Sequence, residues 1–152
     1  MKVIDAQPLN PEPARLVGGV IVTHGHLASE FIAAAEMIVG PIPHVTPASI
    51  DWHDDMDVAR QELERAIARV SQGRGVLLIT DMFGGAPTDI ASMFLGDGGI
   101  EVVTGANLPM ILKLAEQTAE ASLTEVAQRI RDSGKEGIHL AGELLPRPAK
   151  AG

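Results

Sequence analysis

The sequence predicts a single α/β domain built on an open, mostly parallel sheet of four to five strands with helices on both faces. Short apolar runs, typical of strands buried on both faces, alternate along the chain with segments of helical periodicity. No internal repeat, low-complexity tract or interdomain linker interrupts this alternation. A chain of 152 residues that is 45% hydrophobic is long enough for one such domain and its core.

The first strand is predicted at residues 16–23, which form a continuous apolar run. A helix should follow, because apolar residues recur after this run at helical spacing. These residues are Leu27, Phe31, Ala34, Ala35 and Ile38. Gly40 and Pro41 are expected to end the helix.

The next pair of elements repeats the order of strand and helix. Residues 45–51 predict a second strand, and Pro47 places it at an edge of the sheet because proline cannot donate to a ladder. Residues 54–70 have the periodicity of an amphipathic helix.

Residues 75–80, with the sequence GVLLIT, are the clearest buried strand. A helix should run from Pro87 to about Leu95, since proline in a first helical turn lacks only an amide hydrogen that would be unpaired there. Residues 100–104 predict a fourth strand.

Two helices and a short strand are expected in the last third of the chain. Asn107 can cap a helix over residues 108–117. Ser122-Leu-Thr-Glu125 matches a capping box for the last helix, which Ser133-Gly134 should end. Residues 137–140 are the candidate for a short fifth strand.

The two ends of the chain are expected to be flexible extensions of a domain that spans residues 16–142. Residues 1–15 contain prolines and lack periodicity, and residues 143–152 are similar. No signal-peptide core is present at the start, and the apolar run there is too short to span a bilayer. The protein is therefore expected to be cytoplasmic, without insertion into a membrane.

The composition excludes several classes of function. A net charge of −8 without clusters of Lys and Arg argues against nucleic acid, whose phosphates such clusters bind. The absence of cysteine excludes disulfides, thiolate zinc sites and cysteine nucleophiles. No G-x-x-x-x-G-K-[ST] loop is present, so ATP is not the expected phosphate donor, and no cofactor is expected.

Polar or glycine-rich sequence follows three of the predicted strands, at residues 23–26, 80–87 and 104–107. In parallel sheets, ligands collect outside the carboxyl ends of the strands, where strand order reverses. His24 and Asp81 each lie just past the end of a predicted strand. If the first and third strands are neighbours, the two side chains can meet.

This pairing favours phosphoryl chemistry on a histidine. A neutral imidazole is a nucleophile near pH 7, and a carboxylate on one ring nitrogen fixes the tautomer and leaves the other nitrogen free to attack. The backbone of Gly25, Gly84, Gly85 and Ala86 is the expected phosphate-binding surface, because glycine lets amides approach an anion closely. The donor should carry an activated phosphoryl group, such as a phosphohistidine on another protein.

The other histidines and carboxylates are expected to be structural. His26 is expected to be a surface residue in the first turn of a helix, and His44 and His139 to be structural or solvated. Trp52-His-Asp-Asp-Met-Asp57 has the residue types of a metal site. Carboxylates ahead of a helix more commonly compensate its N-terminal dipole, so no metal is expected.

Four segments in order resemble one known family. They are residues 19–25 (GVIVTHG), 35–40 (AEMIVG), 75–87 (GVLLITDMFGGAP) and 104–110 (TGANLPM). Together they resemble the IIA component of the mannose family of the bacterial phosphoenolpyruvate-dependent sugar phosphotransferase system. The resemblance covers residues 16–141 and depends on the order and spacing of all four segments.

The resemblance implies a phosphotransferase of sugar transport that works through a phosphohistidine. His24 would take a phosphoryl group from phospho-HPr and pass it to a histidine of a IIB domain. Asp81 would hydrogen-bond the His24 ring, and the Gly84-Gly85 loop would cradle the phosphate. No IIB domain follows in this sequence, so the acceptor is expected on a separate chain. The family also implies a homodimer in which residues 137–140 pair antiparallel with the partner's sheet.

This sequence departs from the family in the loop after the third strand. Many members read Asp-Thr-x-Gly-Gly-Ser-Pro there, whereas Met82 and Ala86 replace the two hydroxyl residues here. The side-chain hydrogen bonds to a phosphate would then be lost. Backbone amides and the hydroxyl of Thr23 or Thr88 remain as the expected donors.

Two other functions stay open at this point. The protein could be a regulator that binds partners according to its phosphorylation state, without a dedicated sugar transporter. It could also be a receiver-like signalling domain phosphorylated on Asp81, which follows the third predicted strand. Against the second alternative, the first strand ends in Thr-His rather than in an acidic pair for magnesium.

Overall fold

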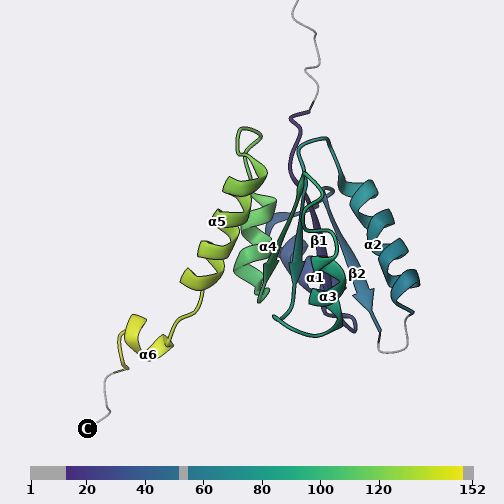
Figure 1. The fold of residues 1–152 in the computed structure, drawn as a ribbon. Helices are drawn as coiled ribbons and strands as arrows, with labels where there is room; N and C mark the ends of the chain where they lie inside the picture. The colour runs from purple at the N-terminus through teal and green to yellow at the C-terminus, as the bar shows by residue number, and fades with distance from the viewer. Residues whose placement is uncertain (1–12, 52–54, 149–152) are drawn as a thin grey trace, which may run out of the picture.

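Strands and helices alternate along the chain in the computed structural model, which describes residues 13–51 and 55–148 (Figure 1). This alternation confirms the predicted α/β class. In chain order the elements are β1 (Gly18–His24), α1 (Leu27–Val39), β2 (Val45–Ile50), α2 (Met56–Val70), β3 (Val76–Thr80), α3 (Ala86–Ser92), β4 (Ile100–Thr104), α4 (Leu108–Ala115), α5 (Leu123–Glu136) and α6 (Ala141–Leu144).

Four strands within the described ranges form one parallel sheet in the order β2-β1-β3-β4. β2 lies at an edge, as Pro47 predicted. β1 and β3 are neighbours, with Val22 opposite Thr80 near their carboxyl ends. The chain leaves β1 toward β2 and leaves β3 in the opposite direction toward β4. Strand order therefore reverses between β1 and β3, at the place where ligands collect in such sheets.

Helices cover both faces of the sheet, and each face has its own core (Figure 1). α1, α4 and α5 pack on the face that includes Ile21 and Leu77. α2 and α3 pack on the face that includes Val20, Val22 and Leu78. Successive side chains of a strand point to opposite faces, so a strand between two helical layers is apolar at nearly every position. Burial of both faces of the sheet therefore explains the continuous apolar runs that predicted the strands.

One prediction near the C-terminus is wrong. α5 does not end at Ser133-Gly134 but continues to Glu136, with Gly134 buried inside it. A Cβ there would lie 2.7 Å from the Sδ atom of Met110 on α4, so glycine permits this close packing of the two helices. Residues 137–140 form no strand in the single chain and lead away from the sheet to α6 instead (Figure 1).

The buried face of α1 also differs from the prediction. Ala28, Ile32 and Ala35 face the core. Leu27 and Ile38, which were expected on that face, are 43% and 60% exposed. α1 is apolar on almost all sides, and apolar spacing cannot define one buried face in such a helix.

The C-terminal segment lies away from the body of the molecule, beyond α5, and carries the short helix α6, which was not predicted (Figure 1). Four apolar side chains of this segment are exposed, namely Ile138, Leu140, Leu144 and Leu145. Most of the expected N-terminal extension lies outside the described residues. In the parts that are described, no helix has the length and apolar character needed to cross a bilayer.

Candidate functional site

The carboxyl ends of β1 and β3 bring His24 and Asp81 together. His24 is the last residue of β1, and Asp81 directly follows β3. Nδ1 of His24 lies 2.8 Å from Oδ2 of Asp81, which confirms the predicted meeting of the two side chains. An ionised carboxylate only accepts hydrogen bonds, so in the neutral imidazole Nδ1 carries the ring proton and Nε2 keeps its lone pair.

Backbone groups hold the Asp81 carboxylate in place. Oδ2 also accepts from the backbone N–H of His24 at 3.1 Å, and Oδ1 accepts from the N–H of Met82 at 3.1 Å. The Asp81 side chain is 11% exposed, whereas that of His24 is 42% exposed. The carboxylate is therefore fixed and mostly buried, and the imidazole remains accessible.

A glycine loop passes close to the free ring nitrogen. Gly84 and Gly85 have φ values of 88° and 90°, which L side chains rarely adopt. A Cβ built on Gly85 would lie 3.3 Å from Nε2 of His24, so a side chain at this position would crowd the nitrogen. Gly85 is the N-cap of α3, which begins at Ala86. The loop predicted to bind phosphate thus lies beside Nε2.

Gly25, the fourth predicted phosphate-binding residue, begins the turn from β1 into α1 with a φ of 53°. It is exposed next to His24, and its carbonyl accepts from the hydroxyl of Ser49 at 2.5 Å. Sequence reasoning missed Ser49. Its position near the carboxyl end of the predicted strand 45–51 was the signal that could have found it.

The two threonines expected to donate to a phosphate are engaged beneath the site instead, which corrects that expectation. Thr23 is fully buried, and its Oγ1 accepts from the N–H of Ala28 at 2.8 Å. Thr88 is 5% exposed, and its hydroxyl donates to the carbonyl of Met82 at 2.5 Å. Both positions lie under the loops rather than beside the exposed ring, so backbone amides remain the expected donors to an anion.

A pocket of about 280 Å³ lies beside the imidazole. His24 and Gly85 line it together with the apolar side chains of Ile50, Met56 and Ile90. Apolar residues carry no chemical signal in a sequence, so these three could not be assigned to the site in advance. The pocket leaves open space beside the imidazole and the backbone of Gly85.

The other histidines lie outside this arrangement. His26 is exposed at the start of α1 and makes no side-chain cap. His44 is buried, and its Nε2 lies 3.1 Å from the carbonyl oxygen of Leu114, so its expected structural role is confirmed. His139 is exposed in the C-terminal segment.

The carboxylate-rich segment ahead of α2 is described only in part, because residues 52–54 lie outside the described ranges. Asp55 is the N-cap of α2 and accepts from the N–H of Asp57 at 3.2 Å. This contact fits the expected compensation of the helix N-terminus. In residues 13–51 and 55–148, no group of three or more His, Cys, Asp or Glu side chains could hold a metal ion.

Known proteins resemble this chain over most of its length. The mannose-specific EIIAB component of the phosphotransferase system (PTS) of Escherichia coli (strain K12) is 28% identical over 139 residues, which are 87% of this chain and 43% of that protein. The sorbose-specific EIIA component of Lacticaseibacillus casei is 29% identical over 132 residues, which are 86% of this chain and 95% of that protein. The chain therefore spans less than half the length of the E. coli relative.

A solved structure and a family model agree with these relatives. The mannose/sorbose specific IIA subunit from Enterococcus faecalis matches with a TM-score of 0.76 and 24% identity over 88% of this chain and 98% of that chain, so the two share a fold. The family model EIIA-man, described as "PTS system fructose IIA component", matches residues 18–131. Because this match covers most of the chain, the protein belongs to the EIIA-man family, the mannose-type IIA components of the sugar phosphotransferase system.

Proposed function

We propose that the protein carries a phosphoryl group on Nε2 of His24, which it takes from phospho-HPr in the cytoplasm and passes to a IIB domain on a separate chain. The observation that carries the proposal is the bond of 2.8 Å between Nδ1 and Asp81. This bond directs the lone pair of the ring to Nε2, beside the backbone of Gly85.

The proposed transfer is a displacement at phosphorus. The Nε2 lone pair of His24 attacks the phosphorus of the donor phosphohistidine, and a new N–P bond forms as the donor's N–P bond breaks. Asp81 favours the cationic ring that forms during the attack. In the second transfer, a histidine of the IIB domain attacks the phosphorus, and the bonding pair returns to Nε2.

The glycine loop supports this proposal as a surface for the phosphoryl oxygens. Gly84 and Gly85 carry no side chains, and Met82 and Ala86 offer no hydroxyl groups. Backbone amides of the loop are therefore the donors proposed to meet the phosphate. Their positions are fixed before the group arrives, which favours transfer because no reorganisation is needed.

The contacts of Asp81 argue against this residue as the phosphoryl acceptor. Both of its oxygens already accept hydrogen bonds from His24 and Met82, and its side chain is mostly buried. An attack by this carboxylate would break the bonds that orient the imidazole. The geometry therefore favours His24 over the receiver-like alternative.

The test is incubation with phosphoenolpyruvate, enzyme I and HPr, followed by mass spectrometry of the intact chain. We expect one phosphoryl group that is stable in base and lost in acid, because a phosphorylated imidazole behaves in this way and an acyl phosphate does not survive mild base. His24→Ala should remove the group. His26→Ala is the matched control and should retain it, since His26 has no part in the site.

A label that survives His24→Ala would contradict the proposal, and a label that mild base removes would point to Asp81. Addition of an unlabelled IIB domain tests the second transfer. A chain that is phosphorylated on His24 but passes the group to no IIB domain would favour the regulatory role instead.

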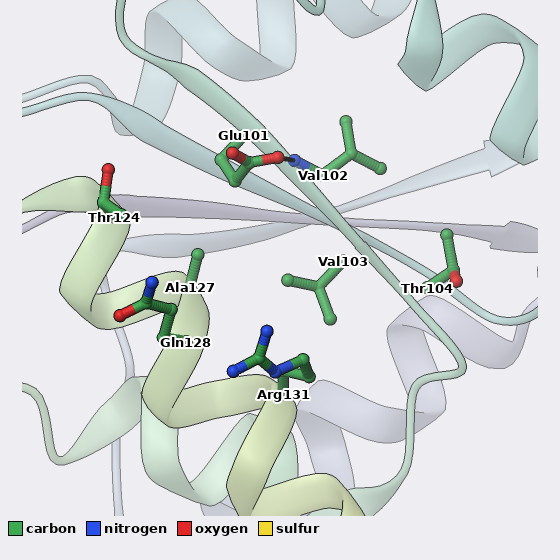
Figure 2. Close-up of a pocket in the computed structure, with 8 residues that line it drawn as sticks. All are labelled: Glu101, Val102, Val103, Thr104, Thr124, Ala127, Gln128 and Arg131. Carbon is green, nitrogen blue, oxygen red and sulfur yellow. Dashed lines mark hydrogen bonds between the residues drawn. The ribbon is translucent and has the colours of Figure 1, made fainter.

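A homodimer is part of the same proposal. β4 is an edge strand whose residues all remain partly exposed. A groove of about 390 Å³ lies between β4 and α5, with Val103 and Ala127 among the side chains that line it (Figure 2). In the single chain, the carboxylate of Glu101 accepts from the N–H of Val102 at 2.9 Å and covers one donor of this strand.

The C-terminal segment supplies the complementary surface. Its four apolar side chains, Ile138, Leu140, Leu144 and Leu145, are each more than 60% exposed in the single chain, and exposed strand edges tend to recruit another strand. Pairing of residues 137–140 with β4 of a second copy would cover both surfaces at once. The exchange is reciprocal, so it gives a closed dimer.

A further inference from the structure

Two buried hydroxyls meet a partly buried carbonyl at the base of the glycine loop. The hydroxyl of Thr88, on α3, donates to the carbonyl of Met82 at 2.5 Å. The hydroxyl of Thr80, at the end of β3, lies 3.4 Å from the same carbonyl and 3.3 Å from the hydroxyl of Thr88. Thr80 is fully buried and Thr88 is 5% exposed, so water has little access to compete for these bonds.

The loop above this network has little side-chain packing to hold it. Met82 and Phe83 are 55% and 82% exposed, and Gly84 and Gly85 have no side chains. Hydrogen bonds must therefore define its path. At its start, the N–H of Met82 donates to Asp81, and at its end the carbonyl of Gly85 accepts from the N–H of Asp89 at 3.0 Å.

The carbonyl of Met82 is the remaining fixed point, and Thr88 is its closest donor. Because the Met82 carbonyl is bonded toward the interior, the backbone must turn back toward the surface through Gly84 and Gly85. Their φ values of 88° and 90° permit this turn. That path brings Gly85 against Nε2 of His24. Without the Thr88 hydroxyl, the partly buried carbonyl of Met82 would lose its closest donor, and the loop would be free to shift.

We infer that Thr88 is a positioning residue for the phosphoryl transfer, which acts through the Met82 carbonyl to set the distance between the glycine loop and Nε2 of His24. The inference rests on the proposed function and concerns the same site. It also gives a role to the hydroxyl groups near this loop. Met82 and Ala86 have no hydroxyls to bind a phosphate, whereas those of Thr80 and Thr88 hold the backbone of the loop from its buried side.

Three variants test the inference. Thr88→Val keeps the shape of the side chain and removes the hydroxyl, whereas Thr88→Ser keeps the hydroxyl and removes the methyl group. Thr46→Val makes the same change as the first variant at a partly buried position of β2, away from the loop.

The first readout needs no partner protein. Amide spectra and hydrogen exchange of Gly84 and Gly85, together with the ring signals of His24, should change in Thr88→Val. They should remain as in the wild type in Thr88→Ser and Thr46→Val. A structural change elsewhere in the molecule would not be confined to these signals.

The second readout is the rate of transfer from phospho-HPr at increasing donor concentration. We expect kcat to fall by about tenfold or more in Thr88→Val, since a misplacement of about 1 Å can cost about 100-fold in rate. KM for the donor should change little, because the substituted side chain is buried and does not itself meet the donor. Thr88→Ser should retain most of the rate.

Wild-type behaviour of Thr88→Val in both readouts would overturn the inference. So would equal losses in Thr88→Val and Thr88→Ser, because the hydroxyl would then be irrelevant. If the wild-type chain takes up no phosphoryl group, the proposed function fails and the catalytic part of the inference fails with it. The signals of Gly84 and Gly85 still decide, in that case, whether Thr88 positions the loop.

Discussion

His24 makes two bonds to the same carboxylate oxygen, one through its ring and one through its own backbone N–H. The position of the imidazole is therefore coupled to the end of β1 and to the start of the loop after β3. Asp81 uses its second oxygen on Met82, the first residue of that loop. A single carboxylate thus fixes the tautomer of the ring and the start of the loop beside it.

Sequence reasoning placed His24 and Asp81 together because their meeting follows from their positions in the sheet. Each lies at the carboxyl end of a strand, and parallel strands place such ends together. The hydroxyls of Thr23 and Thr88 were misplaced because their directions depend on the path of the loops. Two glycines with positive φ set that path, and residue types alone do not specify it.

At the scale of elements, the close approach of neighbouring elements explains two buried glycines. Gly134 lets α5 lie against Met110 on α4, which is the reason that a residue expected to end the helix lies inside it. Gly18 lets the start of β1 lie against the end of α2. A Cβ there would be 2.4 Å from the carbonyl oxygen of Val70.

Gly18→Ala should destabilise the protein by about 1–3 kcal/mol, as overpacking in a core typically does. The atom in the way belongs to the backbone of α2 and cannot move aside as the end of a side chain could. Gly142→Ala is the matched control, because a Cβ there would meet nothing within 4 Å. Unfolding in urea should show a loss for the first variant and none for the second.

Equal midpoints for Gly18→Ala and the wild type would mean that β1 and α2 are not packed as described.

Element types were predictable where the pattern was unambiguous, as in the apolar run of β3 and the caps Asn107 and Ser122. The face of α1 was not, because an almost wholly apolar helix leaves its orientation to tertiary packing.

At the scale of the whole molecule, strand order determines where the site lies. The reversal between β1 and β3 sets His24 beside Asp81 at one edge of the sheet. The edge strand β4 and the exposed segment with Ile138 and Leu140 lie elsewhere and serve the proposed dimer. The sequence predicts a fifth strand at residues 137–140. In this proposal, that strand forms only when a second copy of the chain is present.

The full chain should therefore sediment as a dimer at micromolar concentrations, and removal of residues 138–152 should give a monomer. Met37→Glu is the control, because Met37 is also an exposed apolar residue, at 88%, but lies on α1. This variant should remain dimeric. A monomeric wild type, or a truncated chain that is still dimeric, would contradict the exchange of residues 137–140.

The most direct test of the central claim is to identify the nitrogen that carries the phosphorus. A chain with ¹⁵N-labelled histidine, phosphorylated by phosphoenolpyruvate, enzyme I and HPr, can be examined by heteronuclear magnetic resonance. We predict phosphorus on Nε2 of His24, with Nδ1 still protonated and bonded to Asp81. Phosphorus on Nδ1, or on any other residue, would contradict the account.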